Sequence, residues 1–275
     1  MNLHRIISTV AVLLLPATLL AQTSETLDAE FGARLAVNID KKLSRGLHLS
    51  IEEELRMDQN LSAFDRFHTT VAVTYKVHPN IKLGAGYAMI NPYSSSDGAF
   101  KSSRHRLMLD ATGSLRFGDW RLSLKERLQC TFRTGDFNAY QTSQPLLGLK
   151  SRVKVQYKGW RRWEPYAYIE MRNVLNAPVI KAVYDGTYYY TASGSQYGDA
   201  GWFIDSHTGL YTNRLRGSLG VDYRVSKASS ITLYLMADYV MDKEIDANSE
   251  GTKLKSYTLQ RGFIGWLGAT YTYSF

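Results

Sequence analysis

Seven cationic side chains share one spacing along two consecutive stretches of the sequence. Arg121, Lys125, Arg127 and Arg133 lie on one face of residues 120–134, and Lys150, Arg152 and Lys154 lie on one face of residues 147–157. A period of two places side chains on the same face of a β-strand. Neighbouring strands would merge the two sets into one basic stripe. Such a stripe either concentrates small anions or pairs with carboxylates in a rigid network of ion pairs, and both interpretations stay open.

A second set of residues has the composition of an activated nucleophile. His48, Ser50 and Glu52 alternate along one face of residues 47–57, and His68 points the same way from the next stretch, where it could approach His48. A base beside a hydroxyl group activates a nucleophile, but no glycine-rich oxyanion element accompanies this set. We therefore name no catalytic residue. No metal-ligand spacing and no phosphate-binding loop occur, so no metal and no other cofactor is expected.

The elements that must position these residues are strands, because alternation dominates the chain after residue 28. Eleven alternating stretches are predicted, at about 29–39, 47–57, 66–77, 81–91, 104–117, 120–134, 147–157, 163–173, 214–225, 230–242 and 258–275. Short and long connections alternate between them, and the longest is the tyrosine-rich loop 174–213. Long strands with short turns at one end and long loops at the other are typical of outer-membrane barrels.

Both ends of the chain favour the same class. Residues 1–21 are predicted to be a cleaved signal peptide, which leaves residues 22–275 as the barrel. The last stretch ends in Tyr271, Tyr273 and Phe275, which resemble the C-terminal signal read by the barrel-assembly machinery. Apolar-face aromatic residues gather near both ends of the stretches, as two membrane–water interfaces select. The fold predicted is all-β: an antiparallel, up-and-down transmembrane barrel.

Two observations fit this barrel poorly. Bacterial barrels normally have an even number of strands, so we expect twelve, with ten as the alternative. The missing strand would lie in 174–213 or split from the last stretch at 254–260. Glu53 and Glu126 also fall on the predicted lipid face. We expect a bulge to turn them inward, with a subunit contact as the alternative.

The short motifs of the chain carry a resemblance to a known family. They are Glu52–Arg56, Phe64–Asp65–Arg66–Phe67, Gly84–Ala85–Gly86–Tyr87, Glu170–Met171–Arg172, Asn213–Arg214–Leu215–Arg216 and Leu219–Gly220–Val221–Asp222–Tyr223. Their order resembles an uncharacterised family of outer-membrane barrels common in Bacteroidetes, domain of unknown function family 2490. The resemblance covers nearly all of the chain after the signal peptide. It implies a barrel of this size and supplies no activity and no site residues.

The predicted function is that of a small porin or solute channel with a basic lumen in the outer membrane of a Gram-negative bacterium. The alternatives are a closed barrel that binds partners through its surface loops, with loop 174–213 as a lid or packed on itself, and a lipid-modifying enzyme at the barrel rim. The formal net charge of +8 suits a basic lumen, and an exported chain is not expected to bind nucleic acid. The expected partners are outer-membrane lipid, the barrel-assembly machinery and small anionic solutes.

Overall fold

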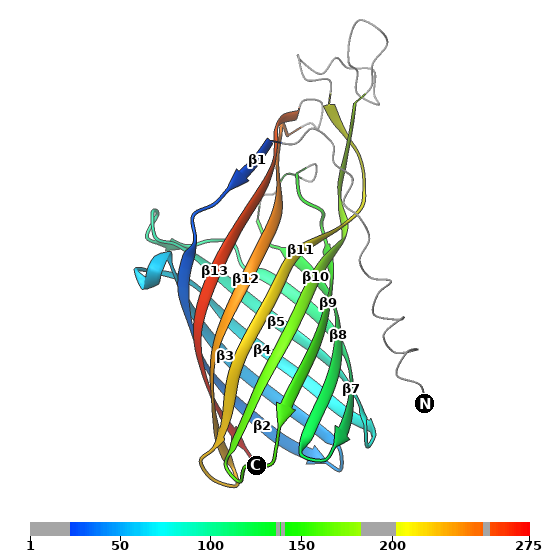
Figure 1. The fold of residues 1–275 in the computed structure, drawn as a ribbon. Helices are drawn as coiled ribbons and strands as arrows, with labels where there is room; N and C mark the ends of the chain where they lie inside the picture. Colours follow the sequence, from blue (N-terminus) through cyan, green and yellow to red (C-terminus); the bar gives the residue numbers. More distant parts are fainter. Residues whose placement is uncertain (1–22, 136–137, 139–140, 183–201, 250–253) are drawn as a thin grey trace, which may run out of the picture.

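The computed structural model describes residues 23–135, 138, 141–182, 202–249 and 254–275, and these form a β-barrel (Figure 1). The predicted signal peptide lies outside the described residues. The strands are β1 (Thr23–Thr26), β2 (Glu30–Ser44), β3 (Leu47–Asp58), β4 (Ala63–His78), β5 (Ile81–Ser94), β6 (Ala99–Phe100), β7 (Arg104–Phe117), β8 (Trp120–Arg133), β9 (Leu146–Tyr157), β10 (Trp163–Ala182), β11 (Trp202–Arg224), β12 (Ser229–Ala247) and β13 (Leu254–Ser274). The described residues contain no α-helix, and one 3-10 turn (Gln59–Leu61) joins β3 to β4.

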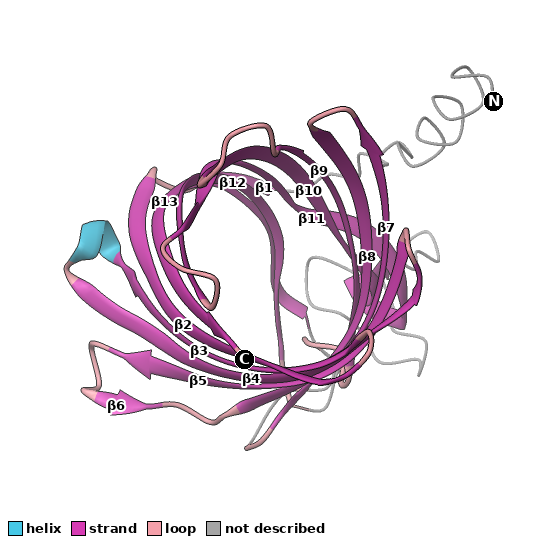
Figure 2. Cartoon of the chain, turned by 90° about the horizontal axis from the view of Figure 1, so that it is seen from below, coloured by secondary structure: helices cyan, strands magenta, loops and turns pink. Residues whose placement is uncertain are grey.

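Eleven of these strands, all except β1 and β6, close into a ring (Figure 2). They correspond to the eleven alternating stretches of the sequence. Neighbours run antiparallel from β2 to β13, but β13 pairs with β2 in parallel, with Glu30 opposite Ile264 and Asp40 opposite Ser274. The predictions of twelve or ten strands and of a wholly antiparallel barrel are therefore wrong. The reason is geometric, because an odd number of alternating strands makes the first and last strands run the same way.

The remaining strands extend this ring. The short strand β1 pairs in parallel with residues 258–261 of β13, on the edge that β2 occupies further along. Strand β6 pairs with the end of β5. Strands β10 and β11 are 20 and 23 residues long and rise past the barrel rim (Figure 1). Residues 174–182 and 202–213 therefore belong to strands and not to the predicted loop, whose remainder lies outside the described residues.

The two faces of the wall differ as the alternation predicts. Apolar side chains point outward and stay exposed, for example Leu109, Ile169 and Leu219 at 60%, 70% and 66%. Polar and charged side chains point inward, and Arg34, Gln129, Glu170 and Asp238 are buried. The buried set therefore combines charged and polar side chains with apolar ones such as Ile90, Met108 and Trp266.

Inward aromatic rings lie across glycines of the adjacent strand. Tyr234 is opposite Gly268, and Tyr166 is opposite Gly220. A Cβ atom at either glycine would overlap the tyrosine ring. Only glycine allows a ring to lie this flat against the wall. These two glycines therefore allow tyrosine rings to fill part of the lumen nearer the short turns.

The two outward carboxylates remain on the outer face. No register shift occurs at Glu53, opposite Thr69, or at Glu126, opposite Ser151, so the predicted bulges are absent and that expectation is wrong. Each carboxylate instead accepts a hydrogen bond from the hydroxyl group opposite it, over 2.9 Å from Thr69 and 2.6 Å from Ser151. A paired hydroxyl lowers the cost of an acidic group on an apolar face. A subunit contact at these carboxylates stays a prediction.

Candidate functional site

The basic stripe predicted from the sequence lies on the inner wall, but its members occupy different levels. One cavity of about 130 Å³ is lined by Lys125, Arg127, Lys150, Arg152 and, from β10, Glu170. We call it the lower cavity because it lies nearer the short turns than the two cavities described below. Of the other three members of the stripe, Arg121 and Lys154 lie nearer the short turns, opposite Gln156 and Ser123. Arg133 lies at the loop end of β8 and is opposite Arg104.

Charges alternate in sign along one row of the inner wall from Arg152 to Asp238. The cross-strand register places Lys125, Arg152, Glu170, Arg216 and Asp238 side by side on β8 to β12. Glu170 accepts hydrogen bonds from Arg152 at 2.5 and 2.8 Å and pairs with Arg216 at 3.4 Å. This row forms the salt-bridge network that was one of the two interpretations of the stripe.

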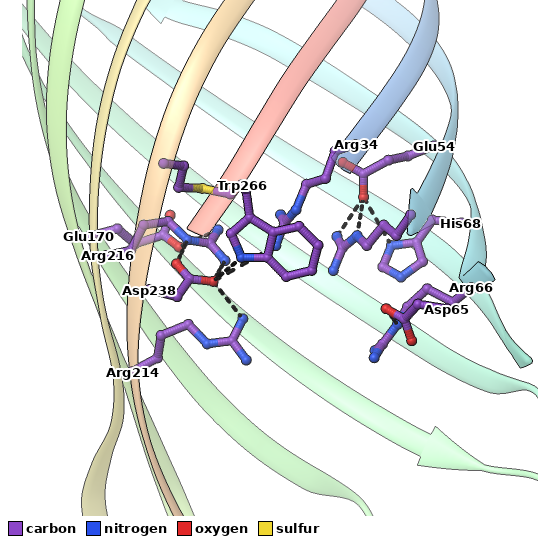
Figure 3. Close-up of polar contacts among 12 residues, drawn as sticks. Arg34, Glu54, Asp65, Arg66, His68, Glu170, Arg214, Arg216, Asp238 and Trp266 are labelled. Atoms are coloured by element: carbon purple, nitrogen blue, oxygen red, sulfur yellow. Dashed lines mark hydrogen bonds and ion pairs between the residues drawn. The ribbon is translucent and has the colours of Figure 1, made fainter. Parts of the chain in front are cut away.

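Asp238 is the centre of that network (Figure 3). Its carboxylate has no solvent exposure. It accepts two hydrogen bonds from Arg216 at 2.6 and 2.9 Å, one from Arg214 at 3.4 Å and one from the Trp266 indole at 3.2 Å. The Arg34 guanidinium lies 3.8 Å away and stacks on the Trp266 ring, 4.1 Å from its centroid. One buried carboxylate thus binds arginines from both β2 and β11.

The next row toward the loops has one sign only. The register aligns Arg127, Lys150, Arg172 and Arg214 on β8 to β11, and we call these four residues the cation row. Asp110 binds Arg127 at 2.7 and 2.8 Å, and Arg214 shares Asp238 with the row below. Among the described residues, Lys150 and Arg172 have no carboxylate partner. Like charges placed directly opposite each other destabilise a sheet. The cation row is therefore expected to lower the stability of the barrel, whereas the ion pairs of the neighbouring row raise it.

Two further cavities adjoin the cation row. A middle cavity of about 160 Å³ contains Lys150, Arg172 and Arg214 in its lining, together with residues from β2, β3, β4, β7 and β13. An upper cavity of about 500 Å³ also includes Arg172 and Arg214 and extends to the connection between β8 and β9. Lys150 belongs to both the lower and the middle cavity. The three cavities therefore follow one another along the lumen, joined by shared cationic residues.

The histidine and serine set predicted on β3 is not assembled into a nucleophile. His48 Nδ1 lies 2.8 Å from Asp40 Oδ1, whereas the Ser50 hydroxyl donates to the carbonyl oxygen of Ala72 at 3.4 Å. His68 is opposite Glu54, six residues along β3 from His48, so the two histidines do not meet. Within the described part of the chain, no three His, Cys, Asp or Glu side chains form a potential metal site.

The C-terminal aromatic residues close the wall next to β2. Tyr271 and Tyr273 point outward from β13 and are 41% and 42% exposed. Phe275 is fixed at the end of the strand, where its backbone N–H donates to Asp40 at 3.0 Å and its carbonyl accepts from Lys42 at 2.8 Å. Their reading by an assembly machinery stays a prediction.

Some residues around these cavities were not singled out by the sequence. Arg172 and Arg214 occupy inward positions, but the stripe was drawn on two strands only, and the register extends it over four. The sequence could have placed Arg172 in the stripe, because residues 163–173 alternate and are joined to residues 147–157 by a short turn. Nothing in the alternation marks Gln141 and Gln144, which line the upper cavity from a loop.

Comparison with known sequences gives a family and no activity. The family described as Protein of unknown function (DUF2490) matches residues 31–249, and no curated protein matches the chain. Among the described residues, no helix is long and apolar enough to span a membrane.

Proposed function

The chain belongs to the family described as Protein of unknown function (DUF2490), and on that premise we propose that this member is an outer-membrane barrel whose basic lumen admits small anions. The observation that carries the proposal is the cation row, with Lys150 and Arg172 unpaired by any described carboxylate. A one-signed lining within low-dielectric walls concentrates counter-ions and favours their entry.

The outer face supports a position in a membrane. A soluble protein rarely exposes a large contiguous apolar surface, yet leucine, isoleucine and valine side chains stay exposed around this ring. Exposed aromatic residues lie near both ends of the strands, as at two lipid–water interfaces. Those near the short turns include Tyr75, Phe117, Trp120, Trp163 and Tyr273, and those nearer the loops include Phe31, Tyr87, Phe132 and Phe263. The predicted signal peptide and the terminal Phe275 favour the same location.

The three adjoining cavities support passage along the lumen. They carry cations from the loop end down to the level of Lys125. Residues of β3, β4 and β7 line the middle cavity together with Lys150, Arg172 and Arg214 of the cation row. Opposite walls approach each other here, and we place the constriction at which ions are selected at this level.

A second candidate function rests on the long strands β10 and β11. Their rise past the rim (Figure 1) favours a barrel that binds a partner outside the membrane, with the ion pairs keeping the lumen closed. This alternative predicts a correctly folded protein that conducts no ions. The lipid-modifying alternative gains no support, because His48 contacts Asp40 and not Ser50.

Planar-bilayer recording of the refolded protein tests the proposal. We expect discrete conductance steps, and we expect Arg172→Gln to lower the conductance in chloride because it removes an unpaired cation from the constriction. Arg45→Gln is the matched control, since it removes the same charge from the exposed turn between β2 and β3. A folded protein without conductance would contradict the channel and favour the partner-binding barrel.

A further inference from the structure

The upper cavity has a lining of unusual charge. Six arginines from five strands border it, namely Arg66, Arg104, Arg106, Arg133, Arg172 and Arg214, together with Lys243. Its only carboxylates among the described residues are Asp242 and Glu244, at the rim on β12. Both already accept hydrogen bonds from neutral donors, Asp242 from the Tyr211 hydroxyl at 3.0 Å and Glu244 from the Gln260 amide at 2.5 Å. Arg66 pairs with Asp65 at 2.6 Å and Arg214 with Asp238 at 3.4 Å. The other four arginines have no carboxylate partner among the described residues.

The arginines are also placed against each other. Arg104 is directly opposite Arg133, and Arg172 is directly opposite Arg214. The Nε–H groups of Arg172 and Arg214 are buried and have no acceptor among the described residues. Directly opposed like charges and unpaired buried donors both reduce stability. A wall built only for rigidity would alternate its charges, as the neighbouring row does from Arg152 to Asp238.

Residues 141–144, between β8 and β9, line this cavity and are held in place by hydrogen bonds. Gln144, between β8 and β9, exchanges hydrogen bonds with the backbone of Arg133 at 2.9 and 3.3 Å. Ser143 donates to the carbonyl oxygen of Asn176 on β10, and Gln141 donates to Asp246 on β12 at 2.7 Å. Residues 141–144 are therefore bonded to β8, β10 and β12. A ligand in the cavity would meet a preformed site, and its binding would cost little conformational entropy.

From this arrangement we infer that the upper cavity binds a small phosphoryl ester of a polyol; the inference rests on the proposed function and names the class of anion that the lumen takes. A volume of about 500 Å³ lies in the range of small-molecule sites. The planar fork of arginine matches phosphate oxygens in pairs. Several guanidiniums around one space suit a dianion with three terminal oxygens better than a planar carboxylate. The Asn213 side-chain oxygen lines the cavity, is buried and has no donor among the described residues, so it can accept a hydrogen bond from a hydroxyl of the polyol.

Calorimetric titration of the refolded full chain in uncharged detergent tests this site without relying on conduction. The probes are glucose 6-phosphate, inorganic phosphate, glucose and succinate. We expect glucose 6-phosphate to bind most tightly, inorganic phosphate more weakly, succinate at least roughly tenfold more weakly than the ester, and glucose not at all. Arg104→Gln with Arg172→Gln should weaken binding of the ester roughly 10- to 100-fold, because two charge-assisted contacts are lost. Arg45→Gln, in an exposed turn, should leave the affinity unchanged.

The contrary outcomes are separable from those of the channel experiment. Absence of glucose 6-phosphate binding to folded protein, or equal binding of the ester and succinate, would overturn the phosphoryl site. Either result beside anion-preferring conductance would leave the proposed function in place. Binding of the ester that needs Arg104 and Arg172, in a protein that conducts no ions, would uphold the site and contradict the channel. Gel mobility with and without heating shows that each variant is folded, because intact barrels migrate differently from unfolded chains.

Discussion

Replacing Lys150 and Arg172 together by glutamate is expected to remove most of the lumen's preference for anions. These are the two members of the cation row without a carboxylate partner among the described residues, and they lie side by side on β9 and β10. The double change removes four units of positive charge from the lining of the middle cavity, whose remaining cations still slightly outnumber its carboxylates. Because a charged lining changes local counter-ion concentration by an order of magnitude or more, the chloride-to-potassium permeability ratio should fall roughly tenfold or more.

The control carries the same change of charge at exposed positions. Arg45 and Arg161 lie in short turns and are exposed, so Arg45→Glu with Arg161→Glu alters the net charge equally while leaving the cation row intact. A permeability ratio that shifts as much in this control as in the double variant would mean that overall charge sets selectivity. An unchanged ratio in the Lys150 and Arg172 variant would contradict the assignment of the constriction.

Removing the buried carboxylate at the centre of the ion-pair network is expected to have the largest effect on stability. Asp238→Ala would leave Arg34, Arg214 and Arg216 facing one another without the group that now binds them. Deleting one partner of a buried ion pair costs roughly 3–5 kcal/mol. The free energy of unfolding, measured by denaturant titration of the refolded barrel in detergent, should fall by about this amount. Tryptophan fluorescence should also change, since Trp266 donates to Asp238.

Asp119→Ala is the comparison for this variant, because Asp119 lies exposed in the turn between β7 and β8. Its free energy of unfolding should stay close to that of the unmodified protein. If Asp238→Ala were as stable as Asp119→Ala, hydration by water would be sufficient to stabilise the three arginines, and the network would not hold the wall together.

The strands and their faces were predictable from the sequence because alternation depends only on neighbouring residues. Residues 104–117 were predicted and observed as a strand with the same ends, and the outward position of Leu109 follows from the period. The closure was not predictable in the same way. The rule of even strand numbers favoured twelve strands, whereas the pairing of β13 with β2 is decided by residues far apart in the chain.

The site was predicted in part, and cross-strand register explains the difference. The positions of Arg127 and Lys150 on one face followed from spacing, but their alignment with Arg172 and Arg214 depends on which residues pair across three strand boundaries. Register also explains Glu53. Its cross-strand partner Thr69 donates a hydrogen bond to the outward carboxylate, so no bulge is needed to turn Glu53 inward. The positions of residues 141–144 could not be predicted from alternation, because these residues lie in a loop between two strands.

The measurement that tests the central claim most directly is the reversal potential of the unmodified protein in a planar bilayer under a gradient of potassium chloride. An anion-preferring lumen predicts a potential of the sign set by chloride diffusion, and added glucose 6-phosphate should reduce the current by occupying the upper cavity. A potential of the sign set by potassium would contradict the account, because the cation row could not then be the element that selects ions.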